Sequence, residues 1–141
     1  MRILGIDYGH KRLGLALSDE DAILATPLPV RVRTTIAEDL SFLAQLARKR
    51  EIAKIVLGLP LNMDGSSGEM AGDVVAFAAA LQKESGLPVV TFDERLTSVE
   101  AERVLVQANL SRKRRKGLRD SLAAVLILQG YLESQREARV P

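Results

Sequence analysis

Hydrophobic residues open the chain in two short runs, each about the length of one β-strand. Positions 2–7 read RILGID and positions 13–18 read LGLALS, and the residues YGHKR between them suit a tight hairpin turn. A third β-rich run at positions 26–32 contains Pro27 and Pro29. Because proline lacks the N–H group that a central strand needs, this run is expected at an edge of the sheet. The chain is therefore predicted to begin with an antiparallel arrangement of strands.

Beyond position 32 the pattern alternates between helices and strands. Thr35 and Glu38 form a capping-box pair that predicts the start of a helix, and KIVLGL at positions 54–59 reads as a buried strand. A second helix follows the loop PLNMDGSSG, and Gly86 and Pro88 end that helix and begin a strand at positions 88–93. The apolar positions at helical spacing are Ile36, Leu40, Leu43 and Ala47 in the first helix, and Met70, Val74, Phe77 and Leu81 in the second.

Two more helices complete the predicted order. Thr97 and Glu100 make a second capping box before an apolar helical pattern at positions 101–108, and a long helix is expected from Arg119 to about Glu133. The resulting order is β, β, β, α, β, α, β, α, α. It predicts an α/β fold, a mixed five-stranded sheet flanked by helices. A chain of 141 residues has the length of one domain, so residues 1–141 are expected to form a single one.

Composition narrows the chemistry that the chain can support. There is no cysteine and a single histidine, His10, so disulfides, zinc–thiolate sites, cysteine nucleophiles and sites built from several histidines are excluded. A bound metal would need oxygen ligands, which favours Mg²⁺ or Mn²⁺ over Zn²⁺. The N-terminus reaches Asp7 too early for a signal peptide, and no apolar run is long enough to span a membrane. A cytoplasmic protein is expected, either a monomer or a homodimer.

Acidic residues stand where predicted elements end or begin. Asp7 closes the first strand, and Asp93 and Glu94 close the last one. Ligands collect at the carboxyl ends of parallel strands, so Asp7 would meet one of the later acids if the two strands were neighbours. Strand alternation points Asp93 and Glu94 to opposite faces, and the sequence alone leaves open which of them faces Asp7. Asp120 falls in the first turn of the predicted last helix, where the alternative role is a helix cap.

Three converging carboxylates would form an oxygen-ligand site for a hard cation, and the natural chemistry is phosphodiester hydrolysis. Basic residues could bind the substrate phosphates, and the single candidates are Lys11, Arg12 and Arg95. A further candidate is a basic run with six basic residues among eight, which begins with Arg112, Lys113, Arg114 and Arg115. This run could also be an ordinary solvated loop. Asn62 lies in a loop, 62–68, that would overhang the strand ends and contact substrate, or serve only as a connector.

Four blocks of the sequence resemble the signature blocks of the YqgF/RuvX family, in the same order: GIDYGHKRLGLALSD (5–19), GLPLNMDGSSGEMA (58–71), DERLTSVEAE (93–102) and DSLAAVLILQGYL (120–132). The resemblance implies an RNase H-like fold related to RuvC-type Holliday junction resolvases, and a nuclease that matures the 5′ end of pre-16S ribosomal RNA. It also implies that Asp7, Glu94 and Asp120 are the catalytic, metal-binding acids. Resolvases usually carry a fourth acid one turn from the helical aspartate. Here position 117 is glycine and positions 123 and 124 are alanine, so substrate phosphate would have to complete a second metal site.

Three other functions share parts of these patterns. A Holliday junction resolvase acting on branched or single-stranded DNA would use the same acids. An actin-like ATPase would use the hairpin of positions 5–14 to hold nucleotide phosphates, but such enzymes need two lobes. A nucleic-acid-binding protein without catalysis could keep the same fold. The sequence does not choose between RNA and DNA, or between endonuclease and exonuclease action.

Overall fold

The fold is built on a mixed sheet of five strands in the order β3-β2-β1-β4-β5. The computed structural model describes residues 1–60, 68–94 and 112–139, for 112–120 and 139 the backbone only. The strands are β1 (Arg2–Tyr8), β2 (Arg12–Ser18), β3 (Ala25–Val32), β4 (Ile52–Leu59) and β5 (Val89–Asp93). β2 is antiparallel to both β1 and β3, whereas β4 is parallel to both β1 and β5. The predicted α/β fold with an antiparallel opening is confirmed.

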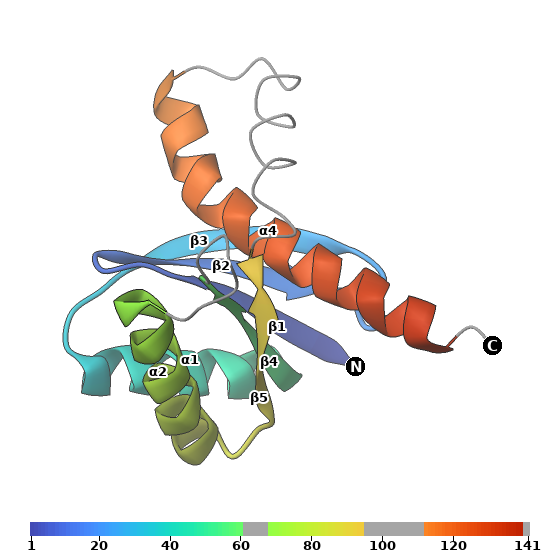
Figure 1. Cartoon of the computed structure of the whole chain (residues 1–141), viewed down its shortest axis with the longest axis horizontal. Helices are drawn as coiled ribbons and strands as arrows, with labels where there is room; N and C mark the ends of the chain where they lie inside the picture. The colour runs from blue at the N-terminus through green and yellow to red at the C-terminus, as the bar shows by residue number, and fades with distance from the viewer. Residues whose placement is uncertain (61–67, 95–111, 140–141) are drawn as a thin grey trace.

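Helices cover both faces of this sheet. α1 (Ile36–Lys49) and α2 (Glu69–Ser85) lie on one face, and α4 (Arg112–Arg139) crosses the other (Figure 1). No helix in the described part of the chain is long and apolar enough to cross a membrane. The helix predicted from Thr97 and Glu100 lies outside the described residues.

Local sequence chemistry sets several element boundaries as predicted. Thr35 caps α1, its hydroxyl accepting a hydrogen bond from the Glu38 backbone N–H at 3.1 Å. Gly86 ends α2 in the left-handed conformation, with φ at 73°. The proline-containing strand β3 lies at the edge of the sheet, where the missing N–H groups cost no ladder bond to a second neighbour.

Strand alternation divides the core into two layers. On β1, Leu4 and Ile6 are fully buried against the side of α1 and α2, whereas Ile3 belongs to the layer under α4. The α4 layer also contains Val56 of β4 and the helix residues Ala124, Ile127, Leu128, Tyr131 and Leu132. The sheet face on which a residue lies therefore decides which helices it can meet.

The start of α4 corrects one prediction. The helix was expected from Arg119, after a basic loop, but it begins at Arg112 and is continuous for 28 residues. Once a helix is anchored by packing, each further residue adds a backbone hydrogen bond, and arginine and lysine are good helix formers. A single glycine, Gly117, costs only about 1 kcal/mol relative to alanine, which is too little to stop the helix. The basic run is therefore helical.

Candidate active site

Asp7 lies on the face of the sheet that α4 covers. Gly5, two residues earlier on β1, packs directly beneath this helix: a Cβ added there would be 2.7 Å from Leu128 Cβ and 3.1 Å from the Ala124 carbonyl oxygen. Residues i and i+2 of a strand share a face, so Asp7 faces the same side as Gly5, one residue before the end of β1.

β5 places Glu94, and not Asp93, on that same side. Val90 and Phe92 pack into the layer under α4, whereas Val89 packs into the opposite layer. The alternation puts Asp93 with Val89, and Glu94 follows directly after β5 with its side chain over the α4 face. The alternation of side chains along β5 therefore decides that Glu94, and not Asp93, lies on the same side as Asp7.

The two acids meet although their strands are not neighbours. β4 lies between β1 and β5, so the outer strands are about 10 Å apart. Glu94 spans this distance by passing over β4 at Gly58, where a Cβ would be only 2.7 Å from Glu94 Cγ and 2.5 Å from Ile127 Cδ1. Gly58 therefore belongs to the candidate site, although the sequence did not single it out, because its contribution is the absence of a side chain.

The contact between the two carboxyl groups changes the acidity of Glu94. Burial, the negative charge of Asp7 and a hydrogen bond to Asp7 raise the pKa of Glu94 from 4.5 to about 7, with a smaller contribution from Asp93. Two carboxylates held this close repel each other unless a proton or a cation lies between them. The donor set is all oxygen, which fits a hard divalent cation.

Asp120 lies in the third turn of α4, not in the first as predicted, so it cannot be the cap of this helix. The contacts of later residues of α4 show in which direction this helix crosses the sheet. Tyr131 lies by Ile3, and Leu128 and Ala124 lie over Gly5, so α4 runs antiparallel to β1. One turn before Ala124, Asp120 continues α4 in the same direction, toward the end of β1 that carries Asp7. The Asp120 side chain lies outside the described residues.

The predicted substrate-binding residues fall into three groups. Lys11 and Arg12 are exposed at the β1–β2 turn. Arg112, Lys113, Arg114 and Arg115 form the first turn of α4, and only their backbone is described. Asn62 and Arg95 lie outside the described residues, as does most of the 62–68 loop. Among the described side chains, no three acidic or histidine residues converge as a metal cluster, so the described part of the site is the pair Asp7 and Glu94.

Comparison with solved structures defines the class of fold. RuvC of T. thermophilus, in complex with a Holliday junction substrate, superposes with a TM-score of 0.62 at 16% identity, covering 97% of this chain and 96% of that one. The fowlpox virus resolvase, in complex with Holliday junction DNA, gives a TM-score of 0.60 at 14% identity and covers 96% and 99%. The protein therefore has the RNase H-like fold of the RuvC-type resolvases.

Sequence comparison then gives the family. The model of the family described as RuvX, Holliday junction resolvase, matches residues 1–134, and the chain belongs to this family. A relative from Halothermothrix orenii is 48% identical and covers 97% of this chain and 98% of its own, and one from Moorella thermoacetica is 51% identical and covers 94% and 95%. Both carry the name "Putative pre-16S rRNA nuclease". Membership of this family, with the names that its relatives carry, identifies the protein as a nuclease, as the resemblance implied.

Proposed function

We propose that this nuclease depends on a divalent metal, Mg²⁺ or Mn²⁺, and that it cleaves phosphodiester bonds at the 5′ end of precursor 16S rRNA in the cytoplasm. The observation that carries the metal dependence is the contact between Asp7 and Glu94, where burial, together with the charge and hydrogen bond of Asp7, raises the pKa of Glu94 to about 7. A carboxyl pair of this kind binds a proton near neutral pH and exchanges it for a cation. The names of the relatives support the RNA substrate.

Each residue then has a separate task. Asp7 and Glu94 hold the cation, and Asp120 is the third acid, arriving from α4. When bound, the cation supplies Lewis-acid chemistry, because it acidifies water for attack on phosphorus and offsets charge on the leaving oxygen. Lys11 and Arg12 bind the phosphates next to the scissile bond. Gly58 keeps the space above β4 open so that Glu94 can reach the site.

A cleavage assay with three substrates tests this function. The substrates are an RNA that spans the precursor 5′ junction of 16S rRNA, a four-way DNA junction and an unstructured single strand, each with Mg²⁺ or Mn²⁺ and with a chelator. We expect cleavage of the precursor RNA that the chelator abolishes. Preferred cleavage of the junction would instead favour a resolvase, the function named for the family. Cleavage that persists in the chelator would refute the metal dependence.

Two adjacent acids that point to opposite faces of the sheet, Asp93 at the end of β5 and Glu94 directly after it, provide the matched variants. Glu94→Gln and Asp7→Asn should each lower the rate by about 10³-fold or more, because a lost ligand removes several kcal/mol of transition-state stabilisation. Asp93→Asn removes a charge at the neighbouring position but on the other face, and it should keep most of the activity. An inactive Asp93→Asn beside an active Glu94→Gln would transfer the role to Asp93.

A further inference from the structure

A second charged cluster lies on the α1 side of the sheet, opposite the face of Asp7, around Asp39 in the first turn of α1. Asp39 is fully buried and binds two arginines: Arg33 Nε donates to its carboxylate at 2.9 Å and Arg31 Nε at 3.3 Å. The backbone N–H of Thr34 donates to the same carboxylate at 3.2 Å. The two arginines thus share one acid, but of the two only Arg33 also bonds to the β1–β2 turn.

Arg33 connects this cluster to the β1–β2 turn. Its Nη1 donates to the Gly9 carbonyl at 2.9 Å, and its backbone N–H donates to the Lys11 carbonyl at 3.0 Å. The guanidinium carbon also lies 4.5 Å from the centre of the Tyr8 ring and 5.6 Å from that of Phe77. Arg31 contacts Asp39, Thr34 and the Phe42 ring instead, all away from the turn.

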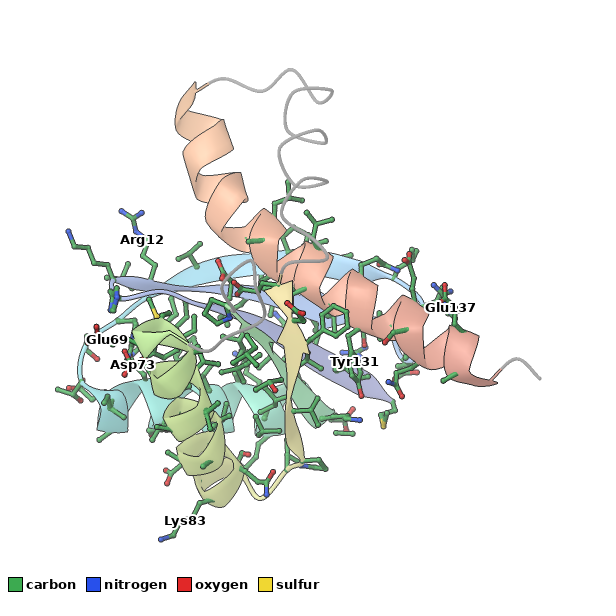
Figure 2. The ribbon with its side chains drawn as sticks, in the orientation of Figure 1. Arg12, Glu69, Asp73, Lys83, Tyr131 and Glu137 are labelled. Carbon is green, nitrogen blue, oxygen red and sulfur yellow. The ribbon has the colours of Figure 1, made fainter. Side chains whose placement is uncertain are left out.

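The turn is held from within as well. The Gly9 N–H donates to the Arg12 carbonyl at 3.0 Å, and a Cβ on Gly9 would lie 2.6 Å from that oxygen. The exposed side chains of this turn are those of His10, Lys11 and Arg12, and Figure 2 shows Arg12 projecting from the end of the hairpin. The same hairpin carries Asp7, so the position of the turn sets the distance between its cations and the catalytic acid.

We propose that Arg33, anchored by Asp39, is a positioning residue that fixes the 9–12 turn so that Lys11 and Arg12 hold a substrate phosphate at a set distance from Asp7. This inference rests on the proposed nuclease function. A buried ion pair contributes little net stability, because the cost of desolvating both charges offsets their attraction. What it provides here is orientation: the planar guanidinium bonds a carboxylate and a carbonyl at once and packs against aromatic rings, an arrangement that a lysine ammonium cannot reproduce.

Arg33→Gln and Arg31→Gln form a matched pair for the test. Each variant removes one positive charge and one partner of Asp39, but only the first frees the turn. With short single-stranded RNA as the probe and Mg²⁺ present, Arg33→Gln should raise KM about tenfold with kcat nearly unchanged, whereas Arg31→Gln should stay within about twofold of the wild type. General destabilisation would lower the active fraction, and hence apparent kcat, without raising KM. Arg33→Lys should not restore the wild-type KM.

Hydrogen exchange provides a second readout that needs no substrate. In Arg33→Gln the peptide covering residues 9–12 should exchange faster than in Arg31→Gln, while the sheet core keeps its protection. If Arg33→Gln fails to fold, Gly9→Ala disturbs the turn without touching the ion pair and should also raise KM. Equal KM and equal exchange in the two glutamine variants would overturn the inference. Wild-type protein that cleaves no nucleic acid would overturn the proposed function. Hydrogen exchange would still test whether Arg33 fixes the 9–12 turn.

Discussion

Substituting Gly58 by alanine tests whether the open space above β4 is what brings Glu94 to Asp7. The added Cβ would lie 2.5 Å from Ile127 Cδ1 and 2.7 Å from Glu94 Cγ. Carbon atoms in contact are normally about 3.5–4.0 Å apart, so both side chains would have to move by about 1 Å. Ile127 is only 1% exposed and has little room to do so. Overpacking of this kind costs about 1–3 kcal/mol of unfolding free energy.

The expected loss of activity is larger than this loss of stability can explain. A domain with a typical unfolding free energy of about 5–15 kcal/mol stays almost fully folded after losing about 2 kcal/mol. Displacing a catalytic group by about 1 Å can lower a rate by about 100-fold. Urea unfolding and metal-dependent cleavage, measured on the same preparation of Gly58→Ala, should therefore show a folded protein with a much reduced kcat.

Two further variants separate packing from catalysis. Ile127→Val removes Cδ1, so in the double variant with Gly58→Ala part of the stability should return, while Glu94 stays displaced and activity stays low. Gly72→Ala on α2 is the control, because a Cβ there meets no atom within 4 Å. It should stabilise the helix by about 0.5–1 kcal/mol and leave cleavage unchanged. Wild-type kcat in folded Gly58→Ala, or activity that recovers together with stability, would refute the proposed role of this glycine.

Three other predictions remain, of which two concern charge and one concerns nucleotide binding. Because the pKa of Glu94 is raised to about 7 in the folded chain, its neutral form stabilises the metal-free protein at low pH. That contribution, about 1–2 kcal/mol after allowing for partial exposure, is lost as the pH rises from about 4.5 to 7. Urea unfolding in the presence of a chelator should show this decrease of the unfolding free energy with pH, and Glu94→Gln should remove it. The same pH dependence in Glu94→Gln would assign the effect to another group. Asp73→Asn, at an exposed site on α2, is the control. Neutralising Arg112, Lys113, Arg114 and Arg115 together should weaken binding equally for different RNA sequences. It should also reduce the salt slope by up to about one unit for each phosphate that the protein no longer neutralises. An unchanged salt slope would leave the run without a role in binding. Calorimetry with Mg²⁺ and ATP should show no saturable binding, and tight binding by a preparation without nuclease activity would favour the ATPase alternative.

Much of the fold could be predicted because its signals are local. The prolines of β3 exclude it from the sheet centre, Thr35 satisfies an N–H group at the start of α1, and Gly86 supplies a conformation that ends α2. Each of these effects depends on a residue and its near neighbours in the chain. The antiparallel opening of the sheet and its alternating continuation then follow from the order of the elements along the chain.

The site depends on relations that are not local. The sequence places Asp7 and Glu94 at strand ends, but their meeting was expected only for adjacent strands, and β4 lies between them. Their contact requires an empty position on that third strand, and Gly58 could only be identified by its neighbours in space. The choice of Glu94 over Asp93 depends on the phase of β5, which a single residue of register would reverse.

The acid of α4 shows how one boundary can change the meaning of a residue. With a helix beginning at Arg119, Asp120 would stand in the first turn, where an acid stabilises the helix dipole and needs no further role. With the helix beginning at Arg112, the same residue stands in the third turn, on an element whose later residues are buried against the sheet. A carboxylate in the third turn no longer gains from the helix dipole, whose effect falls off within the first turn. The corrected boundary therefore removes the cap and dipole roles for Asp120, and this favours the proposal that Asp120 completes the site of Asp7 and Glu94.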